Sequence, residues 1–220
     1  MNAAANRAVL LDLDGTLSDS RPGIVACFRH MLGQLGHDPE AVGDITWAVG
    51  PPIAVSIRTL LEKYGNVDQT RVELGLATYR ARYSEVGLYE CSVYPGIPDM
   101  LAALTEAGRT LCVATSKRRD FAERVVDFLD IRRYLPKVYG ALPGGGLDDK
   151  QDLLAEILRV EGFSAAATTM VGDRLHDIHA AKANALRSIG VLWGYGGQTE
   201  LQAAGADVIA ATPAEIVSQV

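Results

Sequence analysis

Short apolar runs recur along the chain, and polar or amphipathic segments separate them. A short apolar run bounded by turn-forming residues is typical of a strand that is buried on both faces. The pattern predicts six strands, at residues 8–13, 110–114, 138–141, 168–171, 188–193 and 207–209.

The segments between these runs place apolar residues three and four positions apart, which is the spacing of one helix face. The clearest helices are expected within residues 97–104, 121–129 and 153–158. Strands that alternate with helices predict an α/β fold, in which helices cover both faces of a Rossmann-like parallel sheet. In such folds the ligand binds beyond the carboxyl ends of the strands.

Residues 17–90 interrupt this alternation because they contain helical patterns only. Ser20-Arg21-Pro22 is a plausible helix start, with an N-cap and a proline in the first turn. We expect two domains: an α/β core of residues 1–16 and 91–220, and a small helical domain of residues 17–90. A helical domain inserted directly after the first strand can close over the end of that strand as a lid.

Composition and charge exclude several classes of function. The formal net charge of −6 disfavours a nucleic-acid partner, and no stretch approaches the roughly 18 apolar residues that a membrane span needs. The first seven residues are too polar for the hydrophobic region of a signal peptide. Three widely spaced cysteines argue against disulfides and zinc and fit buried thiols in a reducing cytosol, so we expect a cytoplasmic protein. The sequence leaves a monomer and a homodimer open.

Two carboxylates follow the first predicted strand, at Asp12 and Asp14. Side chains alternate along a strand, so both start on the same side and converge on one spot, and Gly15 allows the backbone to approach a ligand closely. Such a pair indicates a bound cation, a shared proton or covalent chemistry on an anion. The alternative is an acidic turn that caps a helix.

Two further strand ends carry groups suited to an anion. Thr115 and Ser116 follow the second long run, and their hydroxyls can bind a phosphate or cap a helix. Lys150 follows a loop with three glycines and opens a helix, where its charge opposes the helix dipole. The alternative for Lys150 is an exposed position on a loop.

A fourth strand end repeats the acidic pattern, with Asp173 and Asp177 one helical turn apart. Their oxygens suit a hard cation such as Mg²⁺. His176 and His179 offer the alternative of a transition metal or of ordinary surface residues. Because the ends of parallel strands meet at one sheet edge, we expect all four groups to form one site.

The motifs at these four strand ends, taken in order, resemble the phosphatase branch of the haloacid dehalogenase (HAD) superfamily. The helical insert resembles the C1-type cap of that superfamily. Three further segments resemble phosphoglycolate phosphatases and related cytosolic nucleotidases: Val49-Gly50-Pro51-Pro52, Val93-Tyr94-Pro95-Gly96 and Ile189-Gly190-Val191-Leu192-Trp193-Gly194-Tyr195-Gly196.

The resemblance implies a Mg²⁺-dependent phosphomonoester hydrolase with a small phosphorylated metabolite as its partner. Asp12 would be the nucleophile and Asp14 the general acid and base. Phosphate would be held by Gly15, Thr115, Ser116 and Lys150. The metal would be held by Asp12, the carbonyl of Asp14, Asp173 and Asp177, the last directly or through another ligand.

The substrate that we expect first is 2-phosphoglycolate, with a nucleoside 5′-monophosphate as the alternative. A small acidic substrate needs a cation in the helical domain, for which Arg58 and Arg82 are candidates. A nucleotide needs an aromatic shelf, for which Trp47 and Tyr83 are candidates. The alternative for Trp47 is a place in the domain core. Gly50 and Pro51 are further candidate substrate contacts.

Other readings stay open on the same motifs: a β-phosphoglucomutase-like phosphotransferase, a dehalogenase, or a non-catalytic binding protein on this fold. Two local departures from the family pattern carry expectations of their own. Asp148 and Asp149 could compete for the ammonium of Lys150. Ala185 stands where glycine usually makes a turn, so we expect Asn184 to carry that turn.

Overall fold

The six apolar runs form one parallel sheet with the strand order β5-β4-β1-β6-β7-β8. The computed structural model describes residues 7–51, 53–65 and 67–220. Every predicted strand is present, with ends shifted by at most four residues. The strands are β1 Ala8–Leu11, β4 Thr110–Arg118, β5 Lys137–Ala141, β6 Thr168–Gly172, β7 Arg187–Val191 and β8 Val208–Ala210.

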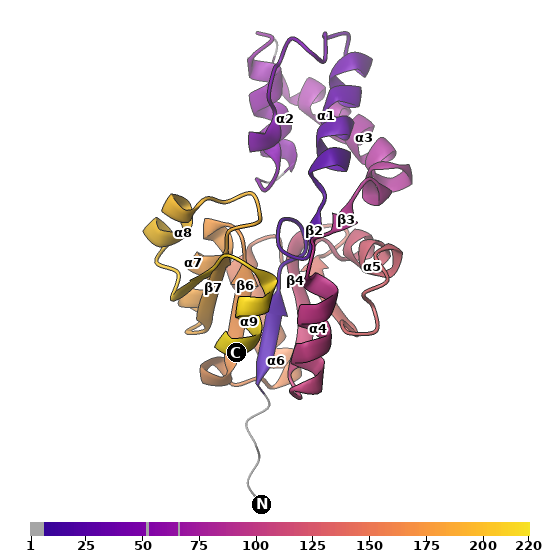
Figure 1. The fold of residues 1–220 in the computed structure, drawn as a ribbon. Coiled ribbons are helices and arrows are strands. Elements are labelled where there is room, and N and C mark those ends of the chain that lie inside the picture. Colours follow the sequence, from indigo (N-terminus) through magenta and orange to yellow (C-terminus); the bar gives the residue numbers. More distant parts are fainter. Residues whose placement is uncertain (1–6, 52, 66) are drawn as a thin grey trace, which may run out of the picture. The chain divides into compact units, whose positions relative to one another are not determined.

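Helices cover both faces of this sheet, which confirms the predicted α/β class (Figure 1). The core helices are α4 Ile97–Glu106, α5 Arg119–Phe128, α6 Lys150–Glu161, α7 Leu175–Ala183, α8 Gln198–Ala204 and α9 Pro213–Gln219. On one face, Leu10, Cys112 and Met170 of three neighbouring strands pack against Leu153 and Ile157 of α6. The apolar spacing that predicted α6 therefore marks the helix face that is buried.

The sheet topology places the end of β1 between the ends of β4 and β6. Leu10 of β1 is paired with Cys112 of β4 on one side and with Met170 of β6 on the other. The strand order therefore reverses direction at β1, and such a switch point leaves a crevice beyond the carboxyl ends of the strands. Asp12 follows β1 directly, so it lies beyond the carboxyl end of the strand at this switch point.

A two-stranded antiparallel ribbon, which the sequence did not predict, joins β2 (Ser18–Asp19) to β3 (Ser92–Val93). The contacts divide the chain next to this ribbon. One unit consists of the residues up to Asp19 together with Ser92–Val220, and the other is Ser20–Cys91. The helical unit contains α1 Arg21–Gln34, α2 Ile53–Glu62 and α3 Gln69–Glu85, with 3₁₀ turns at Thr46–Ala48 and Gly87–Tyr89.

The helical unit has its own apolar core. The rings of Phe28 and Tyr79 lie 4.8 Å apart, and those of Tyr79 and Tyr83 lie 5.5 Å apart. Tyr83 is buried, so it belongs to this core and is not free to serve as an aromatic shelf. Helix α1 starts where the sequence predicted, although Ser20 makes no side-chain capping hydrogen bond.

The turn after α7 differs from the prediction. Asn184 has a φ of −101°, whereas Ala185 itself has a φ of +56°. Ala185 therefore occupies the left-handed conformation that usually requires glycine. The prediction that Asn184 carries the turn was wrong. Its side-chain amide instead donates hydrogen bonds to the carbonyls of Gln151 and Ala180.

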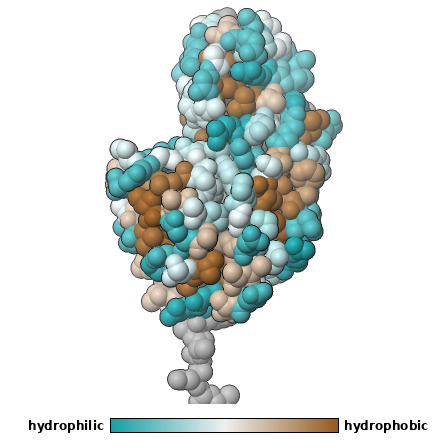
Figure 2. All heavy atoms as spheres, viewed as in Figure 1, coloured by the Kyte–Doolittle hydropathy of each residue, from teal (hydrophilic) through white to brown (hydrophobic). Residues whose placement is uncertain are grey.

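Hydrophobic side chains on the face shown in Figure 2 lie in separate patches within a largely polar surface. Patches of this kind are ordinary on a folded domain. Among the described residues, no helix is long and apolar enough to cross a membrane. The polar N-terminal segment 1–6 and Pro52 of the Val49–Pro52 motif lie outside the described residues.

Candidate active site

The carboxylate of Asp12 is held at the end of β1 by the regular strand pairing of its backbone. The amide of Asp12 donates to the carbonyl of Val171 at 3.0 Å, so the parallel ladder with β6 extends to this residue. The side chain is 11% exposed. A carboxylate so deeply buried requires partners of opposite charge.

The chain turns sharply after this strand and brings Asp14 to the rim of the site. The amide of Gly15 donates to the carbonyl of Ser18 at 2.8 Å. The amide of Ser18 in turn donates to the carbonyl of Leu13 at 2.9 Å. Gly15 has a φ of +87°, and a β-carbon there would lie 2.3 Å from Oδ2 of Asp173. Only glycine fits, because the turn approaches a second carboxylate closely.

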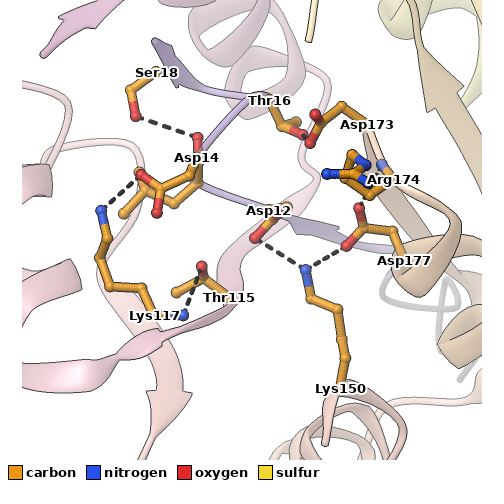
Figure 3. Close-up of polar contacts among 11 residues, drawn as sticks. Asp12, Asp14, Thr16, Ser18, Thr115, Lys117, Lys150, Asp173, Arg174 and Asp177 are labelled. Carbon is orange, nitrogen blue, oxygen red and sulfur yellow. Dashed lines mark hydrogen bonds and ion pairs between the residues drawn. The ribbon is translucent and has the colours of Figure 1, made fainter. Parts of the chain in front are cut away.

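The second strand end brings Thr115 and Lys117 into the site. Thr115 is buried, and its hydroxyl accepts a hydrogen bond from the amide of Lys117 at 3.2 Å. Ser116 is exposed. The ammonium of Lys117 lies 2.6 Å from Oδ1 of Asp14, and Figure 3 shows the Asp14 side chain turned toward it.

Lys117 reaches this position through an irregularity in β4. The pairing of β4 with β5 changes register between Thr115 and Arg118. Gly140 of β5 allows the close approach, since a β-carbon there would lie 2.4 Å from the carbonyl oxygen of Lys117. The sequence carried no clear signal for Lys117, because a bulge cannot be read from an apolar run.

Lys150 lies between two carboxylates, as Figure 3 shows. Its Nζ is 2.9 Å from Oδ1 of Asp12, and it also donates to Oδ1 of Asp177. Burial disfavours the lysine charge, but the charges of Asp12 and Asp177 outweigh burial and raise the pKa of Lys150 above its usual range. The ammonium therefore stays charged and pairs with both acids.

Asp148 and Asp149 do not compete for this ammonium, contrary to expectation. Oδ1 of Asp149 accepts from the amide of Gln151 at 2.7 Å and so caps α6. Oδ2 of Asp148 accepts from the amide of Gly146 at 3.0 Å within the glycine loop. Local backbone donors satisfy both side chains, so neither reaches Lys150.

The last two carboxylates, Asp173 and Asp177, are buried and fully hydrogen-bonded. Oδ1 of Asp173 accepts from the hydroxyl of Thr16 at 3.3 Å, and Oδ2 accepts from the amide of Tyr195 at 2.7 Å. Oδ2 of Asp177 accepts from the amide of Arg174 at 3.0 Å. These bonds fix the direction of both carboxylates toward Asp12.

Three of these acids could share one metal ion. Asp12, Asp173 and Asp177 each offer an oxygen atom, and the three atoms lie within 4.8 Å of one another. Oδ1 of Asp12 accepts no hydrogen bond of regular geometry from the described residues, in spite of its ion pair with Lys150. A buried oxygen left in that state, beside two further carboxylates, fits a hard cation such as Mg²⁺.

The raised pKa values of two of these acids also favour a bound cation. Burial raises the pKa of Asp12 to about 6, against the opposing charge of Lys150. Burial raises the pKa of Asp173 to about 8, and the charges of Asp177 and Asp12 add to this rise. A bound cation would relieve both. His176 and His179 are exposed, and neither belongs to this acidic group.

The candidate substrate residues Trp47, Gly50, Pro51 and Arg58 lie in the helical unit. Trp47 is 38% exposed, with the ammonium of Lys63 5.0 Å from its ring centroid, so it is not domain core. Gly50 is exposed and Pro51 is half-buried. Arg58 is exposed and donates to the side chain of Gln69 at 2.8 Å.

Arg82, the other candidate cation, is already paired. It makes two hydrogen bonds to the carboxylate of Glu90, at 2.8 and 3.0 Å, and a third to Sγ of Cys27 at 3.0 Å. A bidentate pair of this kind fixes the guanidinium in place. Arg82 therefore stabilises the helical unit and is not available to an acidic substrate.

Comparison with known proteins agrees with the architecture and the motifs. The family model described as haloacid dehalogenase-like hydrolase matches residues 9–191. A 5′-nucleotidase of Pseudomonas aeruginosa is 37% identical over 195 residues, which cover 89% of this chain and 86% of that protein. A phosphoglycolate phosphatase of Neisseria gonorrhoeae is 34% identical over 208 residues, covering 91% of this chain and 87% of that protein.

The chain is also similar to a protein named as a kinase and to a solved phosphatase structure. Tyrosine-protein kinase PtkA of Mycobacterium tuberculosis is 38% identical over 189 residues; these cover 86% of this chain but only 62% of that protein. The crystal structure of a predicted phosphatase from Clostridium acetobutylicum superposes with a TM-score of 0.87 and 31% identity, covering 98% of each chain. The chain therefore belongs to the haloacid dehalogenase-like hydrolases and, within them, to the phosphatases, as its motifs predicted.

Proposed function

We propose that this phosphatase hydrolyses the phosphomonoester of a small metabolite through an aspartyl-phosphate on Asp12, with Mg²⁺ as its cofactor. The observation that carries the proposal is the meeting of Lys150 with the carboxylates of Asp12 and Asp177 at one sheet edge. One buried cation cannot neutralise these acids and an incoming phosphate, so a further positive charge is needed.

In the first step, an oxygen of the Asp12 carboxylate attacks phosphorus and the bond from phosphorus to the ester oxygen breaks. Asp14 gives its proton to the departing alcohol. The hydroxyl of Thr115 and the ammonium of Lys150 would bind the phosphoryl oxygens. The amide of Gly15 donates to the carbonyl of Ser18, so we assign Gly15 to the tight turn and not to a phosphate contact. Ser116 is exposed, so we assign it a weaker contribution through its backbone.

In the second step, Asp14 takes a proton from water, and the oxygen of that water attacks phosphorus. Inorganic phosphate leaves, and Asp12 is restored as a carboxylate. Asp12, the carbonyl of Asp14 and Asp173 would hold the Mg²⁺ ion, with Asp177 beside them. When bound, Mg²⁺ supplies charge that draws the anionic phosphate toward the anionic nucleophile.

For the substrate, we now place a nucleoside 5′-monophosphate ahead of 2-phosphoglycolate. Trp47 is exposed and can stack on a base, while Arg82 is held by Glu90. The 37% identity with a 5′-nucleotidase over most of both chains supports the same order. The argument from Trp47 and Arg82 takes the helical unit to be a cap that closes over the site.

2-Phosphoglycolate remains the second candidate because of Lys117. This buried ammonium lies beside Asp14, the group that would protonate the leaving oxygen. A carboxylate one carbon away from that oxygen could reach the same cation. The similarity to phosphoglycolate phosphatases supports this candidate.

The test is phosphate release from a panel of esters: adenosine 5′-monophosphate, 2-phosphoglycolate, glucose 6-phosphate and p-nitrophenyl phosphate. Each is assayed with and without Mg²⁺, beside Asp12→Asn. We expect Mg²⁺-dependent turnover that is lost in Asp12→Asn, with the nucleotide hydrolysed fastest. Preference for 2-phosphoglycolate would reverse the order of substrates, and phosphate passing to a second alcohol in place of water would favour the phosphotransferase reading.

A further inference from the structure

The loop that follows β7, Trp193–Gly196, touches the site at three points, and the proposed chemistry assigns it no role. The amide of Tyr195 donates to Oδ2 of Asp173 at 2.7 Å. The indole Nε1 of Trp193 donates to the carbonyl oxygen of Thr16 at 2.9 Å. The hydroxyl of Tyr195 donates to Oδ1 of Asp19 at 3.2 Å.

The loop fits against Asp173 so closely that two of its positions accept only glycine. A β-carbon at Gly194 would lie 2.3 Å from Cβ of Asp173 and 2.3 Å from the carbonyl oxygen of Gly15. A β-carbon at Gly196 would lie 1.9 Å from the carbonyl oxygen of Asp173. The next residue, Gly197, has no atom within 4 Å of such a carbon. The close approach is thus confined to the part of the loop that faces Asp173.

Two of these contacts act on the Asp173 carboxylate and on the turn that contains Thr16. Thr16 donates through its hydroxyl to Oδ1 of Asp173, and its carbonyl is held by Trp193. The amide of Tyr195 occupies the other oxygen, so both oxygens of Asp173 have a donor that depends on this loop. A carboxylate with a donor on each oxygen keeps one orientation.

We propose that Trp193–Gly196 is a positioning loop that orients Asp173 toward the metal through the Tyr195 amide and the Trp193–Thr16 contact. The inference rests on the proposed function, because it takes Asp173 to be a ligand of Mg²⁺. Neither Trp193 nor Tyr195 touches the reacting atoms; both act through Asp173 and Thr16. The loop therefore affects Mg²⁺ affinity directly and affects the chemical steps only through the bound metal.

The test is the Mg²⁺ dissociation constant of the full chain, measured by titration calorimetry, with folding checked by circular dichroism. Gly196→Ala pushes the loop away from Asp173, and we expect Mg²⁺ to bind at least about tenfold more weakly. Gly197→Ala is the matched control, with the same change one residue away in open space. We expect its Mg²⁺ affinity to equal that of the wild type.

Two aromatic variants keep the test decisive if Gly196→Ala fails to fold. Trp193→Phe removes the indole donor and keeps an aromatic ring at this position, and we expect weaker Mg²⁺ binding. Tyr195→Phe keeps the backbone amide, so we expect its Mg²⁺ affinity to be unchanged. Weaker binding by Tyr195→Phe would overturn the assignment to the amide.

The outcomes separate the loop from the proposed function. A wild type that binds no Mg²⁺ would overturn both. If the wild type binds Mg²⁺, and folded Gly196→Ala and Trp193→Phe bind it equally well, the positioning role is wrong while the proposed cofactor stands.

Discussion

The ammonium of Lys117 lies 2.6 Å from Oδ1 of Asp14, with the two side chains 6% and 21% exposed. Asp14 is the proposed general acid and base, and the ion pair with Lys117 fixes the position of its carboxylate. The pair depends on the bulge in β4, which turns Lys117 toward the end of β1.

Lys117→Met should therefore lower catalysis through Asp14. We expect kcat/KM to fall about tenfold for adenosine 5′-monophosphate and less for p-nitrophenyl phosphate, because an alcohol needs a proton to leave whereas p-nitrophenolate leaves readily without one. Steady-state kinetics on both esters measures this. A loss confined to 2-phosphoglycolate would contradict the positioning role and favour a contact between Lys117 and the substrate carboxylate.

Lys150→Met should destabilise the metal-free protein, since it leaves Asp12 and Asp177 buried without their cation. Removal of one partner of a buried ion pair costs about 3–5 kcal/mol. Urea unfolding in the presence of a chelator measures the change. Mg²⁺ should recover part of the loss.

The control for this variant is Arg159→Met, which breaks an exposed pair with Glu156. Exposed pairs contribute little to stability, so its unfolding midpoint should match that of the wild type. Equal midpoints for Lys150→Met and the wild type would show that Lys150 does not neutralise the buried acids.

The metal-free protein should lose stability as the pH rises. Burial raises the pKa of Asp173 from 3.8 to about 8, so the folded state holds this proton where the unfolded state has released it. The folded state then binds more protons between these two values, and the free energy of unfolding falls as pH rises through that window. Thermal unfolding at pH 5 and pH 8 with a chelator measures the effect.

Asp173→Asn provides the comparison for this pH dependence, because its side chain carries no charge at either pH. We expect the variant to lose less stability between pH 5 and pH 8 and to gain less from added Mg²⁺. A wild type that is more stable at pH 8 than at pH 5 without metal would contradict the assigned shift.

Ala185→Gly should stabilise the protein. Ala185 is exposed and has a φ of +56°, so the substitution relieves left-handed backbone strain and removes no buried contact. The gain should be about 1 kcal/mol in the free energy of unfolding. Ala183→Gly, at the exposed last residue of α7, should change stability in the opposite direction because glycine disfavours helix.

Much of the fold could be predicted because a strand that is buried on both faces consists of consecutive apolar residues, which are visible in the sequence. The ribbon of Ser18–Asp19 and Ser92–Val93 escaped prediction, since two residues per strand are too few to show a period. The turn at Ala185 escaped for another reason: surrounding structure imposed a conformation that the local residue preferences oppose.

The candidate site divides in the same way. Asp12, Thr115, Lys150 and Asp173 could be named from the sequence because parallel strands end at one edge, whatever the details of packing. Lys117 could not be named, because its contact with Asp14 needs a change of register that no local pattern encodes. Asp148 was misjudged because backbone donors in its own loop satisfy it.

By itself, the sequence determined the α/β class, the order of the strand-end motifs and the side chains available for chemistry. These properties follow from short-range patterns of burial and turn formation. Only the tertiary structure decided that Arg82 pairs with Glu90, that Lys117 pairs with Asp14 and that the Trp193–Gly196 loop donates a hydrogen bond to Asp173. Such pairings join residues far apart in the chain, and their geometry exists only once the backbone has closed around them.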